Sequence, residues 1–426
     1  MDHFQYCGGV LHGEGVDLST LAERFGTPQY VYSQQTLLDH YDRIEAAFAP
    51  LQAVICFAVK SCQNLAILRL LRARGSSFDV VSGGELARVL EAGADPSRVV
   101  YAGVGKTDAE LRAALRANIG WFNIESEAEL GNLGSLAAER GVTARVALRI
   151  NPDVDPHTHV YTTTGKRETK FGIDLPDAER VFTAFQKRPG VHLAGIHLHL
   201  GSPVNSVDPY VEAVERVLPF IDGLRRRGHE IRALNVGGGF GAHYDGSEAP
   251  PASAYAQRLV PLLSGRDLEI YLEPGRSIAA NAGVLLTRTL YTKSSGRRQF
   301  VIVDAAMTEL IRPALYGSFH FVWPVRLPSG AHPPARRADH REPGTAPVDI
   351  VGPVCESGDF LAKDRWLPSV RRGDLLCVFS AGAYGFVMSS QYNSRPRAAE
   401  VLIEGSEARL IRRRESYDDL VAAERV

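Results

Sequence analysis

The sequence predicts an α/β chain with an added all-β part: a (β/α)8 barrel of the TIM type, then a C-terminal β-sandwich or β-barrel domain that also takes the N-terminal segment. Between residues 53 and 275, eight short apolar runs alternate with amphipathic stretches of helical period. After about residue 285 the runs are short and are separated by turn residues, as in all-β domains. Eight strand–helix repeats favour a closed parallel barrel, and an open doubly wound sheet is the alternative.

The predicted elements follow in chain order. The barrel strands are predicted over 53–60, 76–82, 98–103, 120–126, 144–151, 193–201, 232–239 and 269–275. Helices are predicted between them over 64–74, 84–93, 108–118 and 125–141. Later β runs span 298–305, 348–354, 374–380 and 398–405, and the strand-like Tyr30–Ser33 can pair with them. We therefore expect an N-terminal segment (1–35), a barrel (36–285) and a C-terminal β domain (286–426).

Two connections in the barrel are long, 151–172 and 240–253, and both leave the C-terminal ends of predicted strands. Barrel enzymes keep their active sites at that face, and long loops in compact domains are usually functional. A third segment, 325–347, is rich in Pro, Arg and His and is predicted to be an exposed loop.

Composition limits the class of protein. The 426 residues carry 48 basic and 49 acidic side chains, a net charge of −1, so no field exists to gather nucleic acid or an anionic membrane. The odd number of cysteines, without a CxxC pair, fits neither a disulfide framework nor a zinc cluster. With no signal peptide and no apolar run of membrane-spanning length, a cytoplasmic protein is expected.

Four features at the predicted C-terminal rim carry chemistry. Lys60 ends an apolar strand, where a desolvated amine can form an imine, although a surface lysine fits equally well. Gly237–Gly239 follow the seventh strand, the usual place of a barrel phosphate site. Glu273 and Arg276 follow the eighth strand and suit a ligand with a cationic and an anionic end, or form a surface ion pair.

The fourth feature is the pair His197 and His199 on the sixth strand, where the period of 2 places both rings on one face. They could bind a metal, stack on a flat cofactor, or simply line the barrel. The metal interpretation lacks a strong third ligand in the sequence. Lysine, glycine turn, carboxylate and imidazole together describe a site for pyridoxal 5'-phosphate, in which a carboxylate keeps the pyridine nitrogen protonated.

These motifs resemble the diaminopimelate decarboxylase family, within the barrel-type, alanine-racemase-like enzymes that use pyridoxal phosphate. The resemblance covers nearly the whole chain and includes FAVKSCQN (57–64), FDVVSGGEL (78–86), GIHLHLGS (195–202), NVGGGFG (235–241), EPGR (273–276), RPALY (312–316), CESGDFLAKDR (355–365) and GAYGFVMSSQYNSRPRAAEVL (382–402). It implies decarboxylation of meso-2,6-diaminopimelate to L-lysine and carbon dioxide, in a homodimer whose active sites are shared between subunits.

The resemblance also implies residue roles. Lys60 would be the Schiff-base lysine, His199 would stack on the cofactor ring and Glu273 would contact its nitrogen. The remaining cofactor-binding positions that it implies are Asp79, Ser202, Gly238, Gly239, Gly275, Arg276 and Tyr384, the last from the second subunit. Cys355, also from that subunit, would protonate the carbanion.

Substrate choice follows from the distal end of the substrate. Arg276, Arg312 and Tyr316 match family positions that bind the distal carboxylate, Glu356 matches the position for the distal ammonium, and Tyr384 also reaches the substrate. A decarboxylase for ornithine or lysine would have little use for Arg312, because a guanidinium repels an amine.

The chain departs from the family pattern at Pro203 and Gln391. These departures keep open a relative that acts on another dicarboxylic, basic or carrier-bound amino acid in a secondary pathway. A non-catalytic homologue, a metal-dependent barrel hydrolase and a racemase are further alternatives.

Overall fold

The computed structural model describes residues 2–155, 170–246 and 249–426 of the chain and divides it into two compact units. The barrel unit comprises residues 40–241 and 249–276, and the β unit comprises the chain up to residue 39, residues 242–248 and everything from residue 277. The domain limits expected at residues 35 and 285 stay a prediction, because compactness does not test which parts fold independently.

The barrel unit holds a closed ring of parallel strands. Around the ring the order is β9, β11, β12, β13, β5, β6, β7 and β8, and a pairing of β8 with β9 closes it. The bounds are β5 (Val54–Ala58), β6 (Ser77–Val80), β7 (Val99–Tyr101), β8 (Trp121–Ile124), β9 (Ala144–Asn151), β11 (Val191–His197), β12 (Ala233–Gly237) and β13 (Glu269–Leu272). All eight predicted strands are present, so the closed barrel is confirmed and the open sheet is wrong. A two-residue strand, β10 (Ile173–Asp174), pairs with β9.

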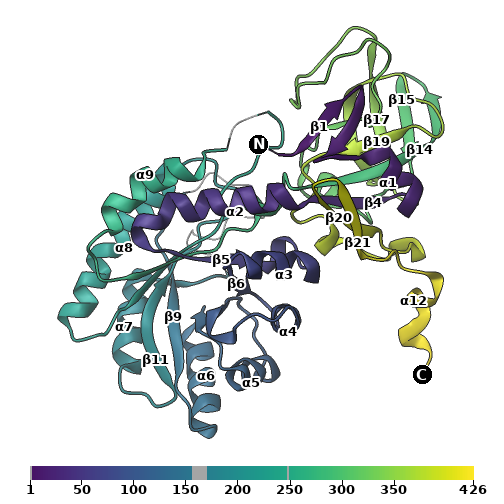
Figure 1. Cartoon of the computed structure of the whole chain (residues 1–426). Coiled ribbons are helices and arrows are strands. Elements are labelled where there is room, and N and C mark those ends of the chain that lie inside the picture. The colour runs from purple at the N-terminus through teal and green to yellow at the C-terminus, as the bar shows by residue number, and fades with distance from the viewer. Residues whose placement is uncertain (1, 156–169, 247–248) are drawn as a thin grey trace. The chain divides into compact units, whose positions relative to one another are not determined.

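Helices α3 to α9 lie between successive barrel strands and surround the ring, while α2 precedes the first barrel strand and α10 follows the last one (Figure 1). The helices are α2 (Gln34–Phe48), α3 (Leu65–Ala73), α4 (Gly83–Glu91), α5 (Asp108–Ala117), α6 (Glu127–Glu139), α7 (Leu175–Phe185), α8 (Asp208–Arg226), α9 (Ala252–Leu263) and the short α10 (Arg276–Ala279). Four of them begin directly after a polar cap whose side chain accepts a backbone N–H of the first turn: Asn64, Ser82, Thr107 and Ser126. Such caps satisfy N–H groups that have no partner within the helix and fix where it begins.

Side chains fill the interior of the barrel. Cys56, Val100, Trp121, Ala147, Ala194 and Ala233 form a buried cluster, against which Val54 and Tyr271 pack. The Trp121 indole donates to the Tyr271 hydroxyl at 2.9 Å, which satisfies the polar end of the largest ring in the cluster. Since this layer is packed with apolar groups, polar chemistry is left to the carboxyl ends of the strands.

The β unit is built on a nine-stranded mixed sheet whose main path runs β18, β17, β15, β14, β4, β20 and β21. Strands β16 and β19 pair with each other, β19 also pairs with β14, and β1, β2 and β3 form a separate small sheet. The bounds are β1 (Phe4–Cys7), β2 (Val10–Gly13), β3 (Val16–Asp17), β4 (Gln29–Ser33), β14 (Gly283–Ser295), β15 (Arg298–Val303), β16 (Val322–Pro324), β17 (Thr345–Val351), β18 (Phe360–Pro368), β19 (Leu375–Val378), β20 (Ala399–Glu404) and β21 (Glu407–Arg412). Its helices are α1 (Leu18–Phe25), α11 (Arg312–Tyr316) and α12 (Tyr417–Val421).

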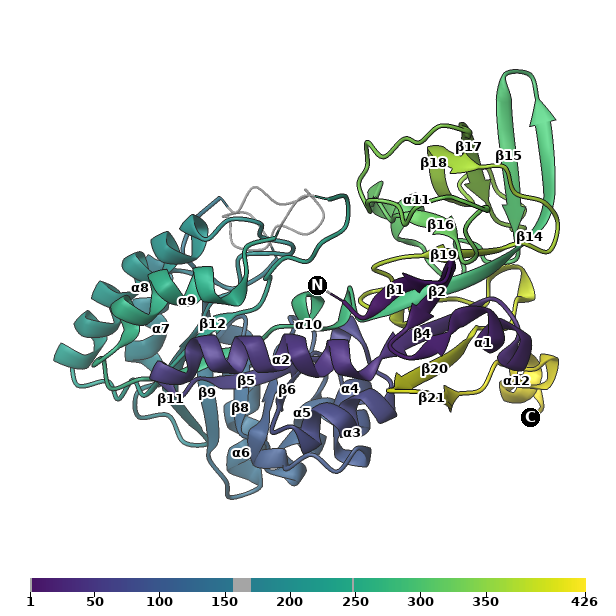
Figure 2. The same cartoon turned by 45° about the horizontal axis from the view of Figure 1, so that its top comes forward.

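The N-terminal segment contributes a strand to the C-terminal sheet. Strand β4 is antiparallel to β14 and parallel to β20, and all five of its residues are buried. The predicted pairing of Tyr30–Ser33 with the later strands is therefore confirmed. Figure 2 shows that the β14–β15 hairpin extends beyond the rest of its sheet.

All the predicted barrel strands except 144–151 run past the observed strand end, and at three of them the overrun includes a functional side chain. Strand β5 ends at Ala58, and Lys60 lies in the 3₁₀ turn Val59–Ser61. Strand β11 ends at His197, so His199 follows the strand, and β13 ends before Glu273. In each case the chain leaves the sheet one or more residues before the functional side chain.

Most of the long connection predicted over 151–172 lies outside the described residues, as does part of 240–253. Among the residues that the structure describes, no helix is both long and apolar enough to span a lipid bilayer.

Candidate active site

Lys60 is held against a buried carboxylate. Its Nζ lies 2.6 Å from Oδ2 of Asp79, at the end of the neighbouring strand β6. The Asp79 side chain is fully buried and that of Lys60 is 29% exposed. The amine therefore combines a charged partner with an open side, as a lysine that reacts with a ligand requires.

Burial, together with the nearby charge of Glu273, raises the pKa of Asp79 to about 7, although Lys60 opposes the shift. A carboxyl with such a pKa exchanges its proton near neutral pH. Asp79 is therefore suited to accept a proton from a neighbouring group near neutral pH.

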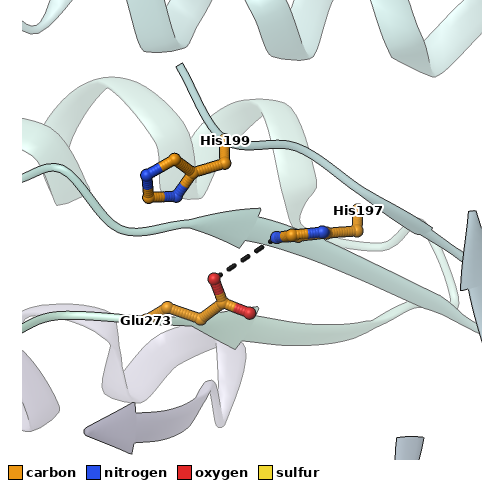
Figure 3. A group of neighbouring side chains, drawn as sticks. All are labelled: His197, His199 and Glu273. Carbon is orange, nitrogen blue, oxygen red and sulfur yellow. Dashed lines mark hydrogen bonds and ion pairs between the residues drawn. The ribbon is translucent and has the colours of Figure 1, made fainter. Parts of the chain in front are cut away.

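Glu273 lies at the centre of a buried polar network. Its Oε1 accepts Nδ2 of Asn235 at 2.6 Å and Nδ2 of Asn123 at 3.2 Å, and its Oε2 lies 3.3 Å from Nε2 of His197. Burial alone would raise the pKa of Glu273, but His197 and Lys60 together lower it below its ordinary value. We therefore take Glu273 to be a carboxylate. Figure 3 shows His197, His199 and Glu273 directed toward one another, with the contact between His197 and Glu273 dashed.

His199 follows strand β11 and is half-buried. Its Nδ1 accepts the N–H of Gly238 at 3.3 Å, which ties the ring to the glycine turn. Burial, reinforced by the positive charges of Arg149 and Lys60, lowers the pKa of His199 well below its ordinary value. The ring is therefore neutral, the state suited to stacking on a flat aromatic group.

The sequence offered no strong third metal ligand beside His197 and His199, but the structure places Glu273 next to them. One ligand atom each of His197, His199 and Glu273 lies within 4.8 Å of the others. However, Lys60 and Arg149 place positive charge on the same group. A divalent cation would have to overcome this repulsion, whereas an anionic ligand would not.

The glycine turn after β12 leaves no room for side chains. A Cβ at Gly238 would lie 2.1 Å from the carbonyl oxygen of Glu273, and one at Gly239, where φ is +100°, would lie 2.1 Å from that of Gly201. At Gly275 a Cβ would approach Oγ of Ser61 to 2.9 Å. At these glycines the backbone N–H groups are not covered by side chains of their own, which is how proteins cradle phosphate groups.

Next to this turn, Nε of Arg276 donates to Oγ of Ser202 at 3.0 Å. Arg276 is buried although it carries a guanidinium. The glycine turn, a hydroxyl and a cation thus meet on the same side of the barrel, and they fit a phosphate. With the amine of Lys60 and the carboxylate of Glu273, the residues present fit pyridoxal phosphate.

Except for Arg276, which belongs to the barrel unit, the predicted substrate residues lie in the β unit. Arg312, at the start of α11, is 6% exposed and donates from Nη2 to Oγ of Ser318 at 3.2 Å. Its guanidinium carbon lies 5.8 Å from the ring centre of Tyr316 and 6.0 Å from that of Tyr384. These distances are within the range of cation–π attraction, so the three predicted residues form one group.

Cys355 and Glu356 are exposed on a turn of the same unit. The N–H of Cys355 donates to Oδ1 of Asn393 at 3.0 Å. The charge of Glu356 and a hydrogen bond with its carboxylate raise the pKa of Tyr392, which also lies near Cys355. The segment YNSRP thus supports the turn that carries the thiol.

The site residues therefore form two groups, one on each unit. The barrel group is Lys60, Asp79, His199, Ser202, Gly238, Gly239, Glu273, Gly275 and Arg276, and the β-unit group is Arg312, Tyr316, Cys355, Glu356 and Tyr384.

Sequence reasoning missed the two amides that hold Glu273. Asn123 and Asn235 lie in barrel strands with side chains that are almost wholly buried. The available signal was a polar residue within an otherwise apolar barrel strand, in FNI and in LNV. Such a residue requires a partner, and the carboxylate of Glu273, just after β13, provides one for both amides.

Comparison with known proteins defines the class. Residues 34–280 match the family model described as the pyridoxal-dependent decarboxylase, pyridoxal binding domain. The chain therefore belongs to the pyridoxal-dependent decarboxylases.

Individual relatives with known names indicate the family to which the chain belongs within this class. The chain is 49% identical to the diaminopimelate decarboxylase of Pseudomonas aeruginosa, over 100% of its own length and 99% of the relative's. The crystal structure of diaminopimelate decarboxylase from Helicobacter pylori complexed with L-lysine has a TM-score of 0.90 at 38% identity, covering 96% of this chain and 99% of that one. The crystal structure of diaminopimelate decarboxylase from M. jannaschii in co-complex with L-lysine has a TM-score of 0.91 at 35% identity, covering 100% of this chain and 98% of that one. Within its class the chain belongs to the diaminopimelate decarboxylase family.

Proposed function

We propose that this protein decarboxylates meso-2,6-diaminopimelate to L-lysine and carbon dioxide with pyridoxal 5'-phosphate as cofactor. The observation that carries the proposal is the arrangement at the barrel rim. The Lys60 amine paired with Asp79, the neutral imidazole of His199 and the buried carboxylate of Glu273 lie at the strand ends that also carry the glycine turn. Membership of the diaminopimelate decarboxylase family supports the choice of reaction.

In this proposal the barrel residues hold the cofactor. Lys60 Nζ binds it covalently, and Ser202, Gly238, Gly239, Gly275 and Arg276 hold its phosphate. When bound, pyridoxal phosphate supplies an electron sink for the charge left at the α-carbon as carbon dioxide departs.

Asp79, Glu273 and His199 would then hold protons and orient the cofactor ring. Asp79 Oδ2, at 2.6 Å, accepts the proton that Lys60 Nζ releases before it acts as a nucleophile, and the pKa of about 7 for Asp79 suits that exchange. Glu273 remains ionised and holds a proton at the pyridine nitrogen. His199, neutral and tied to Gly238, stacks on the ring.

Two residues of the β-unit group, Cys355 and Tyr384, complete the site from a partner subunit. Cys355 of the partner subunit donates a proton from Sγ to the α-carbon, and Tyr384 of the partner subunit contacts cofactor and substrate. The thiol is exposed on the chain, as such a role across an interface requires. The active form is therefore proposed to be a homodimer.

Charge at the distal end of the substrate selects diaminopimelate. Arg312, Tyr316 and Arg276 receive the distal carboxylate, and Glu356 receives the distal ammonium. A guanidinium matches a carboxylate with two parallel hydrogen bonds but repels the terminal amine of ornithine or lysine.

The departure from the family pattern at Gln391 does not favour another substrate. Gln391 donates to Oε2 of Glu415 at 2.9 Å, and this carboxylate is also bound by Arg397, so Gln391 anchors a surface segment. Intact Lys60 and Cys355 argue against a non-catalytic homologue. We also propose a cytoplasmic location, since all five cysteines are free thiols, as is usual in a reducing compartment.

The test is a substrate panel on the purified chain, with carbon dioxide release as the readout. Meso-diaminopimelate is compared with ornithine, lysine, arginine and glutamate in the presence of pyridoxal phosphate. Release from diaminopimelate alone, or at least about tenfold faster than from the others, supports the proposal. Preference for ornithine or lysine would contradict the substrate assignment and would leave the cofactor assignment standing.

A further inference from the structure

A third tyrosine, which no motif had singled out, faces the guanidinium of Arg312. Tyr244 follows the barrel's glycine turn in sequence but belongs to the β unit. The guanidinium carbon of Arg312 lies 5.4 Å from its ring centre, closer than the rings of Tyr316 and Tyr384. The ring of His320, which is fully buried, also meets the Tyr244 ring edge-on at 5.5 Å.

The backbone just before Tyr244 is clamped by a buried amide. Oδ1 of Asn281 accepts the N–H of His243 at 3.2 Å, and its Nδ2 donates to the carbonyl oxygen of His243 at 2.6 Å. Ser380 Oγ donates to the same carbonyl at 2.9 Å. Asn281 is 6% exposed and Ser380 is 7% exposed, so these bonds are shielded from water and hold His243 in one position.

The backbone just after Tyr244 is held by the segment 325–347. The N–H of Ala338 donates to the carbonyl oxygen of Asp245 at 2.9 Å. Residues beside the N-terminal strands hold this segment in turn. Nη1 of Arg336 lies 2.7 Å from Oδ2 of Asp2, and the N–H of Leu327 donates to the carbonyl oxygen of Gly9 at 2.8 Å. The segment 325–347 is therefore a loop that hydrogen bonds and an ion pair hold in place, and we call it the strap.

A cavity of about 350 Å³ adjoins the Tyr244 ring and is also lined by Phe4, Phe321, Phe379 and Arg336. A ring beside such a space keeps its place against Arg312 only while the backbone that carries it stays in position. Asn281 and the strap 325–347 hold this backbone.

We propose that Tyr244 is a positioning residue that holds the guanidinium of Arg312 in the orientation that receives the distal carboxylate of the substrate. The proposal rests on the proposed function, because it takes Arg312 to bind that carboxylate. Asn281 and the strap 325–347 act through Tyr244. The consequence is selectivity: loss of the ring weakens ligands that carry the distal carboxylate and leaves ligands without it unaffected.

The test compares two ligands of the holoenzyme by isothermal titration calorimetry. L-Lysine and cadaverine share a carbon chain and two amines, but only L-lysine carries a carboxylate. Tyr244→Leu is expected to raise the Kd of L-lysine about 3- to 10-fold and to leave that of cadaverine within about twofold. Tyr244→Phe keeps the π face and is expected to bind L-lysine more tightly than the Leu variant does.

Two further variants make the result decisive. Asn281→Ala keeps the ring but frees its backbone, and it is expected to show the same selective loss, even if the Leu variant folds poorly. Tyr291→Leu is the matched control, because Tyr291 also faces a guanidinium, that of Arg372 at 5.0 Å, but is 54% exposed on β14. It is expected to bind both ligands as the wild type does.

Unchanged ratios of the two Kd values in both Tyr244→Leu and Asn281→Ala would overturn the proposal. An equal rise in both Kd values would also overturn it, since that would indicate general damage to the pocket. These outcomes differ from a failure of the proposed function, which would appear as a wild-type chain that releases no carbon dioxide from diaminopimelate.

Discussion

The buried carboxyl of Glu309 makes the stability of the β unit depend on pH. Glu309 is 1% exposed, accepts the N–H of Ala306 at 2.7 Å and lies three residues before Arg312. Burial raises its pKa from 4.5 to about 7, with Asp304 adding to the shift and Arg395, 3.9 Å away, opposing it. The folded chain therefore keeps a proton that the unfolded chain has lost between these two values.

The sign and size of the effect follow from this difference. Because the folded pKa is raised, the stability contributed by Glu309 is fully present below pH 4.5 and is lost as the pH rises through 7. Between pH 5 and pH 8 the loss amounts to about 2.5 kcal/mol in the free energy of unfolding. Glu309→Gln removes the titrating group, so the variant should gain about this much relative to the wild type over that range.

The assay is urea unfolding of the holoenzyme at pH 5, 6.5 and 8, followed by tryptophan fluorescence. Two of the three tryptophans, Trp323 and Trp366, lie in the same unit as Glu309. Glu407→Gln, at an exposed position on β21, is the matched control and should track the wild type. Parallel loss of stability in the wild type and in Glu309→Gln would refute the reasoning.

Three further predictions concern the site itself. Gly239→Ala should weaken pyridoxal phosphate binding about tenfold or more, because its Cβ would meet the carbonyl of Gly201 and φ is positive; an absorbance titration of the apoenzyme measures this, and wild-type affinity would contradict it. Glu273→Gln should lower kcat roughly 100-fold with the cofactor still bound, and a loss below tenfold would count against its role. Asn393→Ala should lower kcat about threefold, because the turn that carries Cys355 loses a hydrogen bond. It should also speed the alkylation of Cys355 relative to that of the exposed Cys7. An unchanged ratio of the two alkylation rates would show that Asn393 does not hold the turn.

Much of the fold was predictable because its signals are local. The eight barrel strands are apolar runs, and the helices between them start at polar caps such as Ser82 and Thr107. The pairing of Tyr30–Ser33 with the C-terminal sheet was also predictable, since a buried strand without neighbours in sequence needs partners elsewhere. Strand ends were less predictable, because apolar residues such as Val59 and Leu198 continue the pattern up to Lys60 and His199. The chain has already left the sheet at these positions.

The site could be predicted only in part. Sequence motifs predicted the roles of Lys60 and Glu273. The contacts of Asn123 and Asn235 with Glu273 could be recognised only in the folded barrel. Tyr244 lies far from Arg312 in sequence and was found only through the fold. Contacts of this kind depend on long-range packing, which a residue pattern along one segment does not encode.

The most direct test of the central claim follows both products of the proposed reaction in wild-type protein and in Lys60→Ala. The account predicts that the wild type, loaded with pyridoxal phosphate, forms carbon dioxide and L-lysine from meso-diaminopimelate in a 1:1 ratio. Lys60→Ala should form neither and should lack the absorbance band of the lysine-bound cofactor. Full activity in Lys60→Ala, or a wild type that forms no L-lysine, would contradict the account.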